Sequence, residues 1–353
     1  MSRFFSEKLS SLEPYTPGEQ PRDMVYIKLN TNESPYPPSP KALAVIEGEA
    51  TRLNLYSDPT ARALHEAIAA HYSITADRVI ASNGSDEILA FAFDAFANGK
   101  SLAFPDVTYG FYPVFANLFG IPYTTVPLDE TFTIRVEDYA HIDSTVVIAN
   151  PNAQTGTYLP LSKIEELVVQ NRDRVVIVDE AYIDFGGESA IPLTDRYDNL
   201  LVVQTFSKSR NLAGARVGFA VGCAELIADL NRVKYSFNPY NVNRLSMAAA
   251  AQAMKDEAYF DECTGKIIET RSFIAEALTK LGFTYPASKA NFILAHSDKI
   301  GGKELYQKLK AKGVLVRHLS DQRITDSIRI TIGTKEQMET LIQKIQEILE
   351  DLT

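Results

Sequence analysis

The segment TFSKSRNLAGARVGFA, residues 205–220, places a lysine, Lys208, between two serines directly after a run of apolar residues. That run, LLVVQ at residues 200–204, is typical of a strand buried on both faces of a sheet. Eight residues beyond Lys208 comes Arg216, with a glycine two residues away on either side. Burial disfavours the charged form of a lysine. A lysine at the end of such a strand therefore indicates a chemical role.

The sequence on the N-terminal side of this segment alternates between Val/Ile-rich runs and stretches with helical spacing. Strands are predicted at 78–82, 101–105, 122–128, 145–152, 174–182, 199–207 and 218–222, and helices at 61–72, 85–96, 111–120 and 161–171. Continuous apolar strands separated by helices predict an α/β fold with a mostly parallel seven-stranded sheet that helices cover on both faces. Ligands of such folds bind at the carboxyl ends of the strands.

The pattern changes at both ends of the chain. Residues 1–45 are rich in proline and polar residues and predict an extended N-terminal arm with part of a small domain. Residues 46–243 form the predicted large domain. Residues 244–353 predict a smaller α+β domain, with one long helical stretch over 244–282 and short strands at 291–297, 314–319 and 327–333.

Composition excludes several classes of function. The net charge is −10 and no basic cluster stands out, which argues against a nucleic-acid partner. No uncharged apolar stretch approaches 18 residues, so no membrane span is expected. The first residues lack an apolar secretion segment, and two cysteines give no disulfide framework, so a reducing cytoplasm is expected. Histidine spacing predicts no metal site.

Polar residues follow the predicted strands. SNGSDEI, residues 82–88, joins a strand to a helix, and its free amides would form an anion site. The donors would be the amides of Ser85, Asp86 and Glu87. An ordinary capped helix is the alternative for this segment. Asp179 directly follows a strand, where a helix cap or a salt bridge is the alternative role. NPNAQTG, residues 150–156, is a simple turn if taken in isolation.

Together these residues match the needs of pyridoxal phosphate (PLP). The amine of Lys208 can form a Schiff base with an aldehyde, and Ser207 and Arg216 can hold a phosphate with the helix amides. Asp179 can hold a protonated ring nitrogen. The chain has neither a G-x-x-x-x-G-K-[ST] phosphate loop nor a G-x-G-x-x-G fingerprint after its first strand. A neutral sugar- or nucleotide-binding module has no need for a buried lysine that faces an acid.

These motifs resemble those of class I/II aminotransferases. TFSKSRNLAGARVGF looks like their PLP-lysine motif, NPNAQTG like their N-P-N-N-P-T-G loop, and VDEAY like their D-E-A-Y segment. Within that group the chain resembles the histidinol-phosphate aminotransferase family in LNTNESPYPPSP, LYSDP, SNGSDEI, PDVTYGFY, VLVRHL and SIRITIGT. The resemblance covers nearly the whole chain and implies the PLP-dependent transferase fold of type I.

The resemblance also implies roles for single residues. Lys208 would bind PLP covalently and move the substrate proton, Asp179 would pair with the ring nitrogen, and Tyr182 would bind the ring hydroxyl. Tyr109 would stack on the ring, and Tyr56 would reach the phosphate of a neighbouring subunit, so a homodimer is expected. Substrate anions would be bound by Arg317 and Arg329, and Tyr15 would close the site. The implied substrates are L-histidinol phosphate and 2-oxoglutarate, with glutamate as a product.

One position departs from the family loop. Ala153 stands where an asparagine usually contacts the ring hydroxyl, and Gln154 follows instead of proline. Either Asn152 replaces the missing contact or Tyr182 serves alone.

Three alternatives share the cofactor. They are an aromatic amino acid aminotransferase, a threonine-phosphate decarboxylase and a PLP-binding regulator without turnover. The regulator is disfavoured because such proteins usually carry an added DNA-binding domain, which we do not expect in this acidic chain.

Overall fold

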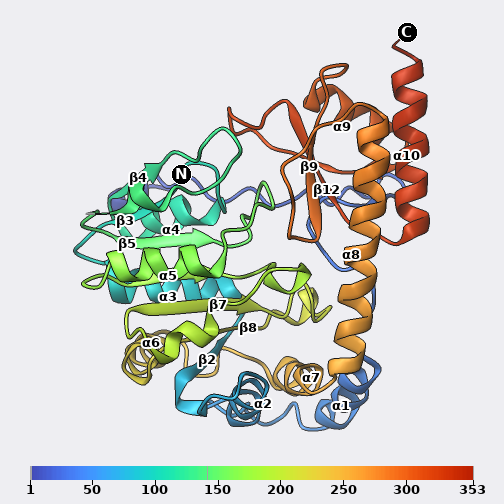
Figure 1. Cartoon of the computed structure of the whole chain (residues 1–353). Coiled ribbons are helices and arrows are strands. Elements are labelled where there is room, and N and C mark those ends of the chain that lie inside the picture. Colours follow the sequence, from blue (N-terminus) through green and yellow to red (C-terminus); the bar gives the residue numbers. More distant parts are fainter. Residues whose placement is uncertain (1, 141, 353) are drawn as a thin grey trace.

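A seven-stranded sheet forms the centre of the larger part of the molecule in the computed structural model, which describes residues 2–140 and 142–352 (Figure 1). Its strands lie in the order β2 (Val79–Ser82), β8 (Gly218–Val221), β7 (Leu200–Thr205), β6 (Val176–Asp179), β5 (Thr145–Ala149), β3 (Leu102–Pro105) and β4 (Tyr123–Val126). Only β8 runs antiparallel to its neighbours. The predicted mostly parallel sheet of seven strands is confirmed.

Helices cover both faces of this sheet because its strands are apolar on both sides. In β5, Val147 and Ala149 pack on one face, whereas Val146 and Ile148 pack on the other. The first face is covered by α3 (Ser85–Ala97), α4 (Phe111–Phe119) and α6 (Ala224–Phe237). The second is covered by α2 (Arg62–Tyr72), α5 (Leu161–Gln170) and α7 (Arg244–Met254).

The carboxyl ends of β6 and β7 meet the start of β8 at one edge of the sheet. Thr205 at the end of β7 and Ser82 at the end of β2 both pair with Gly218. The N-terminus of α3 follows Ser82 by three residues, so it lies at the same edge. This topology gathers the polar residues that sequence analysis assigned to the strand ends.

The C-terminal part contains a second, smaller sheet. Its antiparallel strands lie in the order β11 (Arg317–His318), β12 (Ser327–Thr331) and β9 (Phe292–His296). They pack with α8 (Glu257–Lys280), α9 (Gly302–Ala311) and α10 (Lys335–Glu350) in the core. Figure 1 shows α8 and α10 side by side at this end of the molecule.

Two predicted elements of this part are divided in the structure. The helical stretch over 244–282 is not one helix, because it breaks at Lys255 and Asp256 into α7 and α8. At the break, Asp256 accepts hydrogen bonds from Ser39 and Lys41 at the start of α1 (Pro40–Ala50). The strand predicted at 314–319 is divided into β10 (Val314–Leu315) and β11, which pair with different partners. The domain limits at 45 and 243 stay a prediction, and α7 packs against α1 and α2.

The N-terminal arm crosses the molecule between its two parts. Its strand β1 (Ile27–Lys28) pairs in parallel with β10. The remaining helical turns are short 3₁₀ segments at Glu7–Leu9, Ala76–Arg78, Val136–Tyr139, Ile183–Phe185, Ile191–Asp195 and Ala213–Ala215. Among the described residues, no helix combines the length and the apolar character needed to cross a membrane.

Candidate active site

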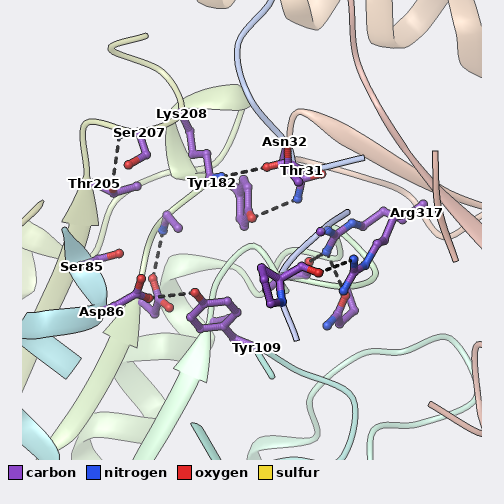
Figure 2. A pocket seen from close by; sticks show the side chains of 18 of the residues that line it. Thr31, Asn32, Ser85, Asp86, Tyr109, Tyr182, Thr205, Ser207, Lys208 and Arg317 are labelled. Atoms are coloured by element: carbon purple, nitrogen blue, oxygen red, sulfur yellow. Dashed lines mark hydrogen bonds between the residues drawn. The ribbon is translucent and has the colours of Figure 1, made fainter. Parts of the chain in front are cut away.

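A cavity of about 290 Å³ opens at the edge where β6 and β7 end, and the N-terminal arm and β12 complete its wall (Figure 2). Most of the residues that sequence analysis selected line it. These are Tyr15, Ser85, Asp86, Tyr109, Asp179, Tyr182, Ser207, Lys208, Arg216, Arg317 and Arg329. Residues up to 314 positions apart in the sequence therefore meet in one site, as the strand-end argument requires.

Lys208 lies three residues beyond the end of β7, and its amine faces the arm. The Nζ atom donates to the carbonyl oxygen of Thr31 at 3.4 Å and lies 5.7 Å from the ring centroid of Tyr182. No carboxylate is paired with this amine among the ion pairs of the described residues. The amine is thus held by a neutral acceptor and is available for covalent chemistry.

Asp179 is almost fully buried at the end of β6. Its Oδ2 atom accepts from the Tyr112 hydroxyl at 2.9 Å, and its Oδ1 atom accepts from the amide of Ala181 at 3.2 Å. Desolvation raises the pKa of Asp179 to about 7, although the Tyr112 hydrogen bond and the Lys208 charge oppose the rise. A buried carboxyl of this kind gains stability from a cationic partner such as a protonated ring nitrogen.

A narrow cup lies at the start of α3. Gly84 has a φ of 81°, which is available to glycine, and it turns the chain into the helix. Gly218 allows β8 to approach, because a Cβ there would lie 2.5 Å from the carbonyl carbon of Gly84 and 2.8 Å from Cα of Ser85. The first amides of α3 are therefore presented to the cavity, where an anion would be stabilised.

Arg216 lies beside this cup with a left-handed backbone, at a φ of 53°. Its Nη2 atom lies 3.4 Å from Oδ2 of Asp86, and Oδ1 of Asp86 accepts from the Tyr109 hydroxyl at 2.8 Å. A non-glycine residue in this conformation is strained, and such strain is concentrated at functional sites. Arg216 thus brings a cation next to the helix amides, as sequence analysis expected.

Two arginines line the cavity, and Figure 2 shows one of them, Arg317, at the end away from Ser85 and Asp86. Arg317 of β11 and Arg329 of β12 are direct cross-strand partners. Arg317 donates to the carbonyls of Thr16 and Pro17, both at 3.1 Å. Arg329 donates to the carbonyl of Ala153 at 2.8 Å, and its buried Nε has no partner among the described residues. Neutral acceptors leave both positive charges available to a bound anion.

Three predicted residues lie outside the cavity. Asn152 is buried in its own loop, where its side chain donates to Val107 and accepts from Gln154 and Thr155. It therefore does not replace the asparagine that Ala153 lacks.

The side chain of Glu87 accepts from Asn83 and Asn241, whereas its predicted role concerns the backbone amide in the first turn of α3. Tyr56 is 80% exposed and stacks on Tyr240. Neither residue is part of the cavity wall.

Sequence analysis missed several residues that hold the site. Sequence analysis gave Tyr112 no role, but its hydroxyl donates a hydrogen bond to Asp179. The sequence feature that could have indicated this role is the spacing of three residues from Tyr109. This spacing brings the two rings together at the start of α4, with ring centroids 5.7 Å apart. Asn32, with a φ of 55°, donates to the Tyr182 hydroxyl at 3.0 Å. Asn32 lies in the family-like segment LNTNESPYPPSP, but sequence analysis gave it no role of its own, because its partner is 150 residues away.

The donor set of the cavity fits PLP. The amine of Lys208 would match the aldehyde of PLP, and the buried carboxyl of Asp179, with its raised pKa, would match the ring nitrogen. The N-terminus of α3, approached by Gly218, and the neighbouring guanidinium of Arg216 would match the phosphate. Tyr182 lies within the same wall and its hydroxyl can serve the ring oxygen.

Comparisons with known proteins identify the family of the chain. Residues 25–345 match the family model of aminotransferase class I and II. The chain is 51% identical to the histidinol-phosphate aminotransferase of Brachyspira hyodysenteriae over 99% of this chain and 100% of that protein. It is also 51% identical to that of Pseudomonas putida over 98% and 100%.

Solved structures share the fold. The histidinol-phosphate aminotransferase of Sinorhizobium meliloti, solved in complex with pyridoxal-5'-phosphate, matches with a TM-score of 0.90 and 22% identity over 100% of this chain and 99% of that chain. At this identity the likeness supports the fold alone, whereas the family follows from the sequence matches. The chain belongs to the class I and II aminotransferases and, within them, to the histidinol-phosphate aminotransferase family.

Proposed function

We propose that this protein uses PLP to transfer the amino group of L-histidinol phosphate to 2-oxoglutarate, as a step of histidine biosynthesis. The observation that carries the proposal is the arginine pair, Arg317 and Arg329, at the opposite end of the cavity from the anion cup. A site with two separate anion positions suits a phosphorylated cofactor and an anionic substrate at the same time. Relatives named histidinol-phosphate aminotransferase at 51% identity support the same substrate.

Each of the cavity residues has a separate role in the proposed reaction. When bound, PLP supplies an aldehyde for imine formation and a ring that takes up electrons from the substrate. Lys208 would hold the cofactor until the amine of the donor displaces it, and its free Nζ would then take the proton from Cα of the donor and deliver it to the carbon of the former cofactor aldehyde. Asp179 keeps a proton on the ring nitrogen. The hydroxyl of Tyr182, held by Asn32, orients the ring oxygen.

The remaining residues position and enclose the substrate. Arg317 and Arg329 bind the phosphate of the donor or the carboxylate of glutamate through charge-assisted hydrogen bonds. Tyr15 of the arm stacks on Phe111 with ring centroids 4.2 Å apart, and it covers the cavity beside Tyr109. An arm held in this way excludes water while the proton moves.

We further propose that the protein is a homodimer in the cytoplasm. Tyr56 and Phe237 are 80% and 75% exposed, and Leu53, Leu55 and Tyr240 are further exposed apolar residues on the same segments. Tyr56 stacks on Tyr240, so these segments form one apolar surface that a second copy of the chain would cover. Both cysteines are free, which suits a reducing compartment.

The test is a single-turnover reaction. PLP-loaded protein is mixed with L-histidinol phosphate without a keto acid, and the cofactor absorbance is followed. We expect conversion to the amine form at low donor concentration, with phenylalanine much weaker, and no conversion by Lys208→Ala. Carbon dioxide release from threonine phosphate would instead identify a decarboxylase, and preference for phenylalanine would identify an aromatic aminotransferase.

A further inference from the structure

Gln154 lies on the loop between β5 and α5 and contacts the substrate end of the cavity. Its Oε1 atom accepts a hydrogen bond from Nη1 of Arg329 at 2.9 Å. The carbonyl of Ala153 accepts from the same Nη1 atom at 2.8 Å. Two neutral oxygens from consecutive residues therefore hold one nitrogen of the guanidinium, and both come from the large sheet's side of the cavity.

This arrangement leaves the opposite edge of the Arg329 guanidinium free to bind an anion. The edge consists of Nε and Nη2, and neither Ala153 nor Gln154 contacts it. The Nε atom is buried and has no partner among the described residues. A buried donor without a partner is costly, and a carboxylate or phosphate would satisfy it with two parallel hydrogen bonds.

The neutrality of Gln154 matters as much as its position. An arginine that pairs with a carboxylate loses much of its attraction for a second anion, whereas an amide oxygen fixes the guanidinium without cancelling its charge. Arg317, the cross-strand partner of Arg329, likewise donates only to carbonyl oxygens among the described residues. Both cations of the pair are thus oriented by neutral acceptors.

We infer that Gln154 is a positioning residue for anion binding: it holds Nη1 of Arg329 so that the Nε–Nη2 edge faces the phosphate or carboxylate of the substrate. This inference rests on the proposed function for the identity of the substrates, but not for the role of the residue. Gln154 occupies the position where the loop that the chain resembles has a proline, and proline has no side-chain acceptor. The contact is therefore made by this chain's own side chain.

Two substitutions of similar size test the inference. Gln154→Met removes the acceptor, and Gln154→Glu replaces it with a charge. Gln170→Met is the matched control, because Gln170 is exposed near the end of the helix that follows the same loop. Calorimetry with succinate measures anion binding to the PLP-loaded enzyme without turnover, and steady-state kinetics with L-histidinol phosphate and 2-oxoglutarate separate KM from kcat.

We expect Gln154→Met to raise the Kd for succinate and both KM values about threefold to tenfold, with kcat within about twofold of wild type. Gln154→Glu should raise them by more than Gln154→Met, because a carboxylate would pair with Arg329 and repel the anion. Gln170→Met should bind and react as wild type does. A wild-type succinate Kd in Gln154→Met, or a fall in kcat with unchanged KM, would overturn the inference.

The two proposals can fail separately. If wild-type enzyme does not convert L-histidinol phosphate but binds succinate in a manner that depends on Gln154, the proposed substrate is wrong and the positioning role stands. If wild-type enzyme converts L-histidinol phosphate and Gln154→Met leaves the KM values and the succinate Kd unchanged, the function stands and the positioning role is wrong.

Discussion

Sequence analysis selected residues that line the cavity where one residue type can do the proposed chemistry. Lys208 and Asp179 follow buried strands, and few roles other than covalent chemistry and charge pairing justify such residues there. Tyr112 was missed because a tyrosine at a helical core position looks the same in sequence whether or not its hydroxyl is used. Gln154 was noticed only as a departure from the family loop, since its partner Arg329 lies 175 residues away.

The hydroxyl of Tyr112 should tune the acidity of Asp179. Tyr112→Phe removes one donor from a buried carboxylate, a hydrogen bond with a net contribution of about 1.5–3 kcal/mol. The carboxyl becomes more basic, so it takes more of the proton from the cofactor ring and turnover slows by about tenfold or more. Pre-steady-state rates of cofactor conversion measure this effect. Tyr139→Phe is the control, because the buried Tyr139 hydroxyl has no hydrogen-bond partner among the described residues.

The raised pKa of Asp179 should make the cofactor-free protein less stable at higher pH. The folded-state pKa is about 7 and the ordinary value is 3.8, so the folded state binds this proton more tightly than the unfolded state between these pH values. Stability therefore falls as pH rises through this window. Asp179→Asn should exceed wild type in free energy of unfolding by up to about 4 kcal/mol at pH 8, with the difference closing near pH 4. Urea unfolding of cofactor-free protein at several pH values measures this, and a constant difference across the window would contradict it.

At the scale of elements, the seven strands of the large sheet were predictable because continuous apolar runs are stable only where both faces of the strand are buried. The helix over 244–282 was predicted too long because the residues around Lys255 and Asp256 have no proline or glycine to mark the break. The break depends on contacts with Ser39 and Lys41, which lie more than 200 residues earlier. The helix propensity of the residues at the break does not reflect such distant contacts. The division of 314–319 into β10 and β11 likewise depends on two different partner strands.

Gly218, where β8 contacts the start of α3, should not tolerate substitution by a residue with a side chain. Gly218→Ala would place a methyl group against the backbone of Gly84 and Ser85 and move the amides of the anion cup. We expect a loss of about 1–3 kcal/mol in stability and weaker retention of PLP. Gly265→Ala is the control, because a Cβ at this position of α8 meets open space and should stabilise the helix by about 0.5–1 kcal/mol. Thermal unfolding and equilibrium dialysis of PLP measure the two effects.

At the scale of the whole molecule, one of the three predicted site residues outside the cavity lies on the surface of the chain. Tyr56 lies on the exposed apolar surface with Tyr240 and Phe237. Its expected role came from the resemblance alone, because no periodicity in the sequence reports on subunit contacts. In the proposed homodimer, Tyr56 would contribute to the active site of the neighbouring copy.

Mixing two inactive variants tests the shared site. Lys208→Ala and Tyr56→Ala should each be poorly active as pure proteins. After dissociation and random reassembly in equal amounts, half of the dimers combine one copy of each, and one of their two sites is then intact. We expect recovery of roughly a quarter of wild-type activity. Recovery of no activity by a mixed population that sedimentation confirms as dimeric would contradict a shared site.

The pairing of the arm with the end of the chain has a consequence for the order of events during synthesis. Asn32 and Thr331 are joined by hydrogen bonds although 299 residues separate them, and β1 pairs with β10. A ribosome releases Asn32 long before it has made β12, so the amide nitrogen and side-chain oxygen of Asn32 must wait for Thr331. The seven-stranded sheet can form earlier, because all of its strands precede residue 222. The nascent chain thus forms the large sheet first, and the C-terminal strands complete the cavity wall only when translation is almost finished.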